Sequence, residues 1–373
     1  MLAPDVSVDC PVSEKFVCDS PLELRHDGNR YVIVGPDDMW PVDPVPRPRW
    51  YDIPCTDGDP PLRTDSDGRA VEPRANRFGS QDLAGRAVIQ SLGQVCGDRL
   101  TISVSSRCAL FSNPALRCAF CSIGFNGRRE RSPGCDGDIH PMIALALQDP
   151  AHPVRHVLIG GGTRDLDDRG YGPVIALAQS ISRAFPALPL SAMTVPPSDD
   201  GQFEHLRDAG VEELAINIEV WSTAAAAEHT PGKHRLFGRA GYLQALSRAL
   251  EVFGARRVRS LVVAGLEPMT DTLSAVEALA RLGVIPVISP FRPLRQTSLQ
   301  DRSPPSLEFL LELHEAALAI CHRHDTCLGP LCEGCQGNTL TVHGLSDIGP
   351  ASTGEDTVPS RDRGESASQA DHG

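Results

Sequence analysis

From about residue 99 to residue 300, short apolar or β-branched runs alternate with amphipathic stretches of helical length. Repeated strand–helix units of this kind predict a parallel sheet covered by helices. The strands expected are Leu100–Ser105, His156–Ile159, Leu188–Val195, Leu214–Val220, Val258–Val263 and Val284–Ser289. The helices expected are Pro141–Gln148, Gly172–Phe185, Gly201–Ala209, Ala240–Phe253, Asp271–Leu282 and Ser306–His322. Six units are too few for a closed eight-stranded barrel, so we predict an α/β fold, a partial (β/α)6 TIM-type barrel with its site at the carboxyl ends of the strands.

Composition divides the 373 residues into four parts. They are an irregular N-terminal extension that caps the barrel (residues 1–97), the barrel core (98–304), a last helix with a Cys-rich auxiliary metal segment (305–345), and a disordered tail (346–373). The first part is dense in Pro, Asp and Gly, and the last is polar with few apolar residues. Within the extension, His26–Val34 is expected to contain a short strand and Ser80–Cys96 to form a helix.

Charge and hydropathy exclude several classes of partner. The formal net charge is −13, which on average repels a phosphate backbone, so nucleic acid is not an expected partner. No apolar run reaches the roughly 18 residues of a membrane span, so no membrane partner is expected either. The first residues lack the basic region and apolar stretch of a secretion signal, and the predicted location is therefore the cytoplasm.

Seven of the twelve cysteines fall into two clusters, which is typical of metal or redox chemistry rather than of a disulfide framework. The first cluster, Cys108, Cys118 and Cys121, has the spacing C-x9-C-x2-C and directly follows the first predicted strand. A structural zinc site usually takes four ligands, whereas three thiolates on an iron–sulfur cube leave one iron open. An open iron suits catalysis, so an iron–sulfur cluster is favoured here and zinc is the alternative.

The C-A-F-C run that ends at Cys121 resembles the cluster motif of the radical S-adenosylmethionine (radical SAM) superfamily, in particular its biotin-synthase-like members. Those partial barrels carry three cysteines on the loop after strand one, with an aromatic residue before the last. Their commonest spacing is C-x3-C-x2-C, so the nine-residue first gap departs from the pattern. The resemblance covers about residues 99–300 and implies a [4Fe-4S] cluster on Cys108, Cys118 and Cys121, with Phe120 beside it and S-adenosylmethionine (SAM) on its open iron.

The resemblance also implies a SAM contact at the end of the second strand. Gly160, Gly161 and Gly162 lie there, where the superfamily has a Gly-Gly-Glu-like element that contacts the amino group of SAM. Thr163 stands where an acidic residue is often found, so the backbone would make that contact. An ordinary strand-ending turn is the structural alternative.

Further cofactor contacts are implied at three later strand ends. Asn217 and Glu219, two residues apart in the fourth strand, are expected to share one face and to approach the ribose or amino group of SAM. The alternative for Glu219 is a structural salt bridge with an arginine. Gly265 is expected near the adenine, and Arg292 against a carboxylate of SAM or substrate unless it is a surface arginine. His229–Leu236 is expected to be a loop that is solvated or meets an anionic substrate.

The second cluster, Cys321, Cys327, Cys332 and Cys335, has the spacing C-x5-C-x4-C-x2-C and follows the last predicted helix. Two interpretations stay open for it. One is an auxiliary iron–sulfur cluster, as in several radical SAM subfamilies, and the other is a zinc site closed by four Cys or His ligands. Whether Cys321 is a ligand or points away within the helix is also open.

The reaction follows from the resemblance. One electron from the reduced cluster cleaves SAM to methionine and a 5′-deoxyadenosyl radical, which abstracts hydrogen from a small-molecule substrate. The outcomes considered are sulfur insertion, oxidation or rearrangement in cofactor or secondary metabolism, and a second cluster favours the first two. A reductant such as flavodoxin or ferredoxin is the expected partner. The alternative from another class is a non-catalytic zinc-binding scaffold with two Cys-rich sites.

Overall fold

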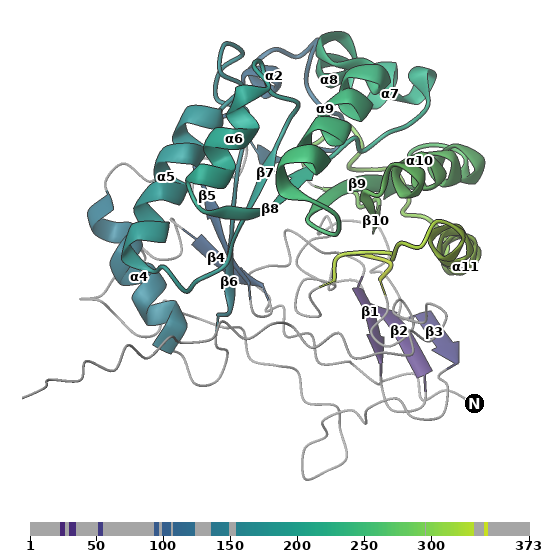
Figure 1. The fold of residues 1–373 in the computed structure, drawn as a ribbon. Helices are drawn as coiled ribbons and strands as arrows, with labels where there is room; N and C mark the ends of the chain where they lie inside the picture. Colours follow the sequence, from purple (N-terminus) through teal and green to yellow (C-terminus); the bar gives the residue numbers. More distant parts are fainter. Residues whose placement is uncertain are drawn as a thin grey trace, which may run out of the picture.

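A computed structural model gives the structure of the chain (Figure 1). It describes residues 23–26, 30–34, 51–54, 93–96, 99–105, 107–123, 136–148, 154–294, 296–331 and 339–341. Cys332, Cys335 and the tail predicted at 346–373 lie outside the described residues, as does most of the predicted N-terminal extension.

Three antiparallel strands form a small separate sheet in the first part of the chain, in the order β1-β2-β3. They are β1 (Glu23–His26), β2 (Arg30–Val34) and β3 (Tyr51–Pro54). The short strand expected within His26–Val34 is therefore confirmed as β2.

The helix predicted over Ser80–Cys96 is wrong at its carboxyl end, because β4 (Gly93–Cys96) is a strand. β4 pairs antiparallel with the next strand, with Cys96 opposite Arg99. The two residues between this pair are Gly and Asp, a sequence that favours a tight hairpin. The hairpin signal therefore outweighs the helical pattern at this point.

Six parallel strands form the curled sheet of a half-barrel, and β4 adds an antiparallel edge to it. They are β5 (Arg99–Ser103), β6 (His156–Gly160), β7 (Leu190–Thr194), β8 (Val211–Ile216), β9 (Val258–Ala264) and β10 (Ile285–Pro290). Neighbours in the sheet follow the order of the chain, as in a TIM-type barrel. The predicted partial barrel is confirmed, and each of its strands overlaps the predicted one.

Helices cover the outer face of the curled sheet (Figure 1). The predicted ones are present as α4 (Asp136–Gln148), α5 (Tyr171–Ala184), α6 (Gly201–Asp208), α9 (Gly238–Phe253), α10 (Met269–Leu282) and α11 (Leu307–Arg323). Three short helices were not expected: α2 (Ala109–Ser112), α7 (Thr223–His229) and α8 (Pro231–Leu236). The segment His229–Leu236, predicted to be a loop, is therefore mostly helical. Pro231 stands in the first turn of α8, where proline needs no hydrogen-bond donor.

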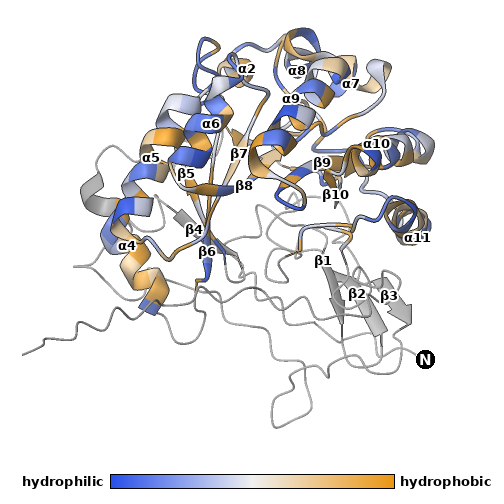
Figure 2. Ribbon diagram, viewed as in Figure 1, coloured by the Kyte–Doolittle hydropathy of each residue, from blue (hydrophilic) through white to orange (hydrophobic). Residues whose placement is uncertain are grey.

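The core lies between the sheet and these helices. Ile102, Ile159, Leu214 and Val258, on four different strands, are fully buried, and Leu279 of α10 is buried with them. Figure 2 shows the same division, with hydrophobic strands and hydrophilic outer faces on the helices. Burial on both faces explains why these strands read as continuous apolar runs in the sequence. Within the described part of the chain, no helix is both long and apolar enough to cross a membrane.

A second apolar cluster joins α10 and α11. A buried histidine of α11 predicts a pH dependence of stability. His314 of α11 is 9% exposed, and burial lowers its pKa to about 4. The unfolded chain binds a proton near pH 6.5, so stability that is present above that pH is lost as the pH falls toward 4. His314→Leu should remove about 2–3 kcal/mol of the stability difference between pH 7.5 and 4.5. Urea unfolding of the wild type and of His314→Leu at the two pH values measures this difference. An identical pH dependence in the two proteins would contradict the prediction.

Candidate metal centre

The three cysteines of the first cluster lie on the loop after β5, at the carboxyl end of the sheet. Cys108 is the N-cap residue of α2, while Cys118 and Cys121 lie in a turn in which the Cys121 N–H donates to the Cys118 carbonyl (3.2 Å). Cys118 is buried, the other two are half-buried, and all three are free thiols. The predicted placement of these cysteines after the first barrel strand therefore matches the structure.

Backbone hydrogen bonds fix this cluster loop, residues 107–123, to its surroundings. The Ala109 N–H donates to the Thr163 carbonyl just past β6 (2.7 Å), and the Ala119 N–H donates to the His229 carbonyl at the end of α7 (2.8 Å). On the other side, the Ser298 hydroxyl donates to the Ala119 carbonyl (3.0 Å). The loop is thus held by segments that follow three different strands.

The nine residues between Cys108 and Cys118 form α2 and a turn. The Asn113 side-chain oxygen accepts from the Ala115 N–H (3.0 Å) and so closes the turn. Arg117 stacks over the Phe111 ring at 4.1 Å and donates from Nε to the Phe111 carbonyl (2.9 Å). These local contacts hold the long gap in one conformation, which accounts for a spacing wider than the usual three residues.

The three thiols lie within electrostatic reach of one another. Burial raises the pKa of Cys118, and it raises the pKa of Cys121 to about 11. A negative charge on a neighbouring thiol in the set of three raises both values further. Such thiols ionise when a metal neutralises them, so a metal bound here would be coupled to their deprotonation.

The donor chemistry of this loop fits an iron–sulfur cluster. Its three cysteines are free thiols, and thiolates are the usual ligands of such clusters. Three protein ligands leave one iron of a four-iron cluster open, whereas a structural zinc site usually takes four protein ligands.

The glycines at the end of β6 allow other segments of the chain to pack directly against their backbone. A Cβ on Gly162 would lie 2.5 Å from the Arg107 carbonyl oxygen and 2.8 Å from the Cys108 Cβ. A Cβ on Gly161, where φ is +134°, would lie 2.9 Å from the Ser105 carbonyl oxygen. The space beside Gly162 is therefore filled by the cluster loop, and the space beside Gly161 by the end of β5 and Ser105, which explains both glycines without a ligand. A backbone contact to SAM at Gly160, Gly161 and Gly162 stays a prediction.

Asn217 and Glu219 lie just beyond β8, because the strand ends at Ile216. The expectation that both side chains share one face relied on the alternation of a β-strand, and that alternation ends before Asn217. The Asn217 side-chain oxygen accepts from the Leu261 N–H of β9 (3.2 Å), and its amide donates to the Met193 sulfur of β7 (3.1 Å). Asn217 thus joins the ends of three strands.

Glu219 has a left-handed backbone, with φ at +64°, which is uncommon for a residue other than glycine. β9 holds this conformation from both sides: the Glu219 N–H donates to the Leu261 carbonyl, and its carbonyl accepts from the Val263 N–H, both at 2.8 Å. Backbone strain of this kind costs about 1–3 kcal/mol and is concentrated at functional sites.

The partner of Glu219 is a lysine, not the arginine considered from the sequence. Lys233 Nζ lies 2.7 Å from Glu219 Oε2, and the two side chains are 14% and 15% exposed. Burial lowers the pKa of Lys233, but the groups around it, with Glu219 first among them, together raise the pKa well above its usual value. The sequence reading missed this pair because it placed Lys233 in a loop, whereas α8 turns the side chain inward.

The remaining predicted residues also lie at the carboxyl ends of strands. Gly265 follows β9 with φ at +95°, and its carbonyl accepts from Arg302 (2.8 Å). Arg292 follows β10 and is half-buried. Phe120 packs against a buried apolar cluster drawn from the ends of β8, β9 and β10 and from α7: Val220, Ala226, Val263, Leu266 and Phe291. The structure thus brings Phe120 against the strand ends that carry the other candidates.

Glu267 is a buried carboxylate two residues after Gly265, in the turn after β9 that the resemblance places near the adenine. It accepts hydrogen bonds from the Trp221 N–H (3.0 Å) and the Ser222 N–H (2.8 Å), directly before α7. Burial raises its pKa, and these two N–H groups act in the opposite direction. Since α7 ends at His229, whose carbonyl binds Ala119, Glu267 supports the cluster loop through that helix. An acidic residue just after a buried strand was the available signal.

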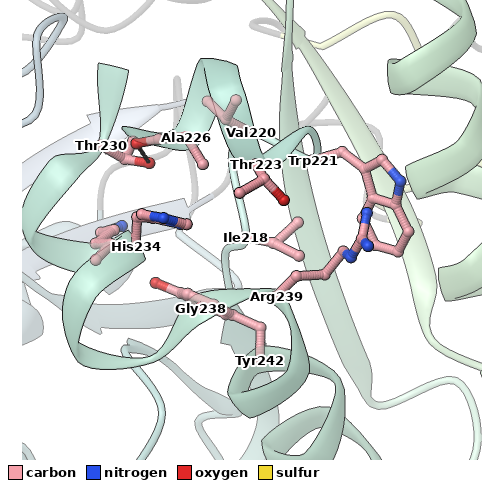
Figure 3. Close-up of a pocket in the computed structure, with 11 residues that line it drawn as sticks. Ile218, Val220, Trp221, Thr223, Ala226, Thr230, His234, Gly238, Arg239 and Tyr242 are labelled. Atoms are coloured by element: carbon pink, nitrogen blue, oxygen red, sulfur yellow. Dashed lines mark hydrogen bonds between the residues drawn. The ribbon is translucent and has the colours of Figure 1, made fainter. Parts of the chain in front are cut away.

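A small pocket lies between the end of β8 and the helices α7, α8 and α9 (Figure 3). Its lining includes Trp221, Lys233, His234, Arg239 and Tyr242. Figure 3 shows the Arg239 guanidinium against the Trp221 ring, 4.7 Å from its centre. The pocket is therefore bordered by cationic side chains next to the Glu219 carboxylate.

The second cysteine cluster is described only in its first half. Cys321 is fully buried in α11, within the apolar cluster that joins α10 and α11, and Cys327 is half-buried. Burial raises the pKa of Cys321 to about 12, and a charge on Cys327 adds to this shift. Cys332 and Cys335 lie outside the described residues, so the second metal site, iron–sulfur or zinc, stays a prediction.

Fold and site together define a partial (β/α)6 barrel with three thiols on the loop after its first parallel strand. No protein-family model matches the chain. Bacteriochlorophyllide c C-7(1)-hydroxylase of Chlorobaculum limnaeum is 27% identical over 129 residues, which are 34% of this chain and 32% of that protein. The chain thus matches about a third of the length of this curated relative.

Three solved structures are similar to the chain. Coproporphyrinogen III oxidase HemN from Escherichia coli, described as a radical SAM enzyme, has a TM-score of 0.39 and 14% identity, over 60% of this chain and 51% of that one. The FeFe-hydrogenase maturase HydG from Carboxydothermus hydrogenoformans has a TM-score of 0.45 and 14% identity, over 61% and 52%. The cobalamin-dependent S-adenosylmethionine radical enzyme OxsB has a TM-score of 0.35 and 12% identity, over 68% and 35%.

Two of these proteins are described as radical SAM enzymes, the superfamily whose cluster motif the sequence resembles. At 12–14% identity and TM-scores below 0.5, these likenesses say nothing about substrate or residue roles.

Proposed function

We propose that the chain is a radical SAM enzyme that holds a [4Fe-4S] cluster through Cys108, Cys118 and Cys121. The observation that carries the proposal is the grouping of three free thiols on one loop, fixed by hydrogen bonds at the carboxyl end of a partial barrel. Three protein ligands leave one iron of such a cluster for a small molecule. A zinc scaffold is less well supported, because a structural zinc site usually takes four protein ligands and the described part of this loop supplies three thiols.

When bound, the cluster and SAM together supply one-electron cleavage of the sulfonium and a 5′-deoxyadenosyl radical that removes hydrogen from a small-molecule substrate. The protein's part is to position these groups and to exclude water. Phe120 and the apolar cluster under it cover one side of the cysteine turn. The residues proposed to bind SAM follow the strands β6, β8, β9 and β10: Gly160, Gly161, Gly162, Asn217, Glu219, Gly265 and Arg292.

Oxidation at an unactivated carbon is the outcome we favour among those the sequence left open. The supporting observation is the match over 129 residues to a protein whose name describes a hydroxylase. Flavodoxin or ferredoxin is the proposed source of electrons, as expected from the resemblance. The substrate of the relative is not carried over, since the match covers only a third of that protein.

The test is anaerobic reconstitution of the full chain with iron and sulfide, followed by reduction with dithionite in the presence of SAM. We expect about four irons and four sulfides per chain at the first site, broad visible absorbance, and release of 5′-deoxyadenosine and methionine. Chromatography with mass detection quantifies both products. Zinc in place of iron, with no nucleoside formed under reducing conditions, would support the scaffold alternative.

A further inference from the structure

Lys233 is a half-buried cation that the sequence placed in a loop and that lies next to the proposed metal centre. It lies in α8, and its ammonium is 2.7 Å from Glu219 Oε2. A buried ion pair contributes little to stability, because the desolvation of both charges offsets their attraction. The position of this pair next to the cysteine loop therefore calls for another explanation.

Backbone contacts hold the first turn of α8 against the cluster loop. The Gly232 N–H donates to the Leu116 carbonyl (3.1 Å), two residues before Cys118. A Cβ on Gly232 would lie only 2.4 Å from that carbonyl oxygen, so glycine is what permits the approach. The Ala119 N–H binds the His229 carbonyl on the other side of Cys118. Lys233, which follows Gly232 directly, is thereby fixed beside Cys118.

The two opposite charges reach the cluster loop from two elements. Glu219 follows β8 and its backbone is held by β9, while Lys233 lies in α8 directly after the glycine that contacts the loop. The electrostatic interactions of both side chains extend to the cysteine turn. Charges at this range act on any charge that the loop carries.

We infer that Lys233 and Glu219 shift the reduction potential of the cluster bound by Cys108, Cys118 and Cys121 in opposite directions, an inference that rests on the proposed function. Reduction adds one negative charge to the cluster, and net charge near a cluster is one of the factors that fix its potential. The Lys233 ammonium favours the reduced state, and the Glu219 carboxylate opposes it. Both residues act on the cluster through their charge and are not ligands of its irons.

The experiment measures the midpoint potential of the reconstituted cluster in the full chain, without SAM, by titration followed with electron paramagnetic resonance. The variants are Lys233→Met, Glu219→Gln, the double variant of both, and Lys233→Arg. Tyr242→Phe is the matched control, since its hydroxyl is buried in the same pocket and burial raises its pKa, so it carries no charge at neutral pH. Circular dichroism and iron content report whether each variant folds and loads.

Lys233→Met should lower the potential, with about a tenfold smaller ratio of reduced to oxidised cluster at a fixed poise, which is 59 mV for one electron. Glu219→Gln should raise the potential, and the double variant should lie near the wild type because both charges are gone. Lys233→Arg and Tyr242→Phe should leave it unchanged. A purely structural pair would change cluster occupancy but not this pattern of opposite shifts.

Equal potentials in the wild type and Glu219→Gln, or a shift of the same sign in both single variants, would overturn the inference alone. If Lys233→Met does not fold, Glu219→Gln and the double variant still decide it. A wild-type chain that binds no cluster would overturn the inference and the proposed function together, so the two failures are distinguishable.

Discussion

Replacing Cys118 with alanine is expected to abolish 5′-deoxyadenosine formation and to remove the iron of the first cluster. Cys118 is the most buried of the three thiols, and the hydrogen bonds on both sides of it fix its position. Loss of a ligand should exceed the roughly 10–100-fold loss in metal affinity or activity that follows removal of an outer-shell partner. Iron and sulfide per chain, with the nucleoside yield per hour, measure the effect after identical reconstitution.

The matched control for this variant is Cys321→Ala, which also removes one buried thiol. Cys321 lies in the apolar cluster between α10 and α11 and not on the cluster loop, so its loss should leave nucleoside formation intact. The iron content of Cys321→Ala additionally reports whether this residue is a ligand of a second cluster. Unchanged iron and unchanged nucleoside yield in Cys118→Ala would mean that the cluster assignment is wrong.

The barrel could be predicted from the sequence because its signals are local. Strands such as His156–Gly160 are buried on nearly every residue, and α10 repeats its apolar positions every three or four residues until Gly283 ends it at φ +84°. The cysteine spacing is likewise a property of consecutive residues. Both features can therefore be recognised without three-dimensional information.

The contacts that complete the site join distant parts of the chain, and for this reason the sequence could not show them. Glu219 and Lys233 are paired by the turn between α7 and α8, which had been expected to be an open loop. Gly162 and Gly232 fit the cluster loop from two sides, and each reads as an ordinary turn glycine in isolation. The role of such residues depends on their neighbours in the folded structure.

Replacing Glu267 with alanine should have the largest effect on stability among the residues around the site. The change leaves the Trp221 and Ser222 N–H groups without their acceptor, and each buried donor left unpaired costs about 1–3 kcal/mol. We expect about 3 kcal/mol less stability and a lower iron content after reconstitution, because α7 carries the His229 carbonyl that binds the cluster loop. Urea unfolding and iron analysis of the same preparation measure both effects.

Two variants separate the role of Glu267 from a general effect of losing a glutamate. Glu251→Ala removes an exposed partner of Arg248 and should cost less than about 1 kcal/mol. Glu267→Gln keeps an oxygen for both N–H groups and should stay within about 1 kcal/mol of the wild type. Because burial raises the pKa of Glu267, its contribution to stability is complete below the pKa of the unfolded chain and falls as the pH rises through the folded value. The stability of Glu267→Gln relative to the wild type should therefore increase as the pH rises from 4 to 7. A decrease over that range would show that the folded protein favours the anion.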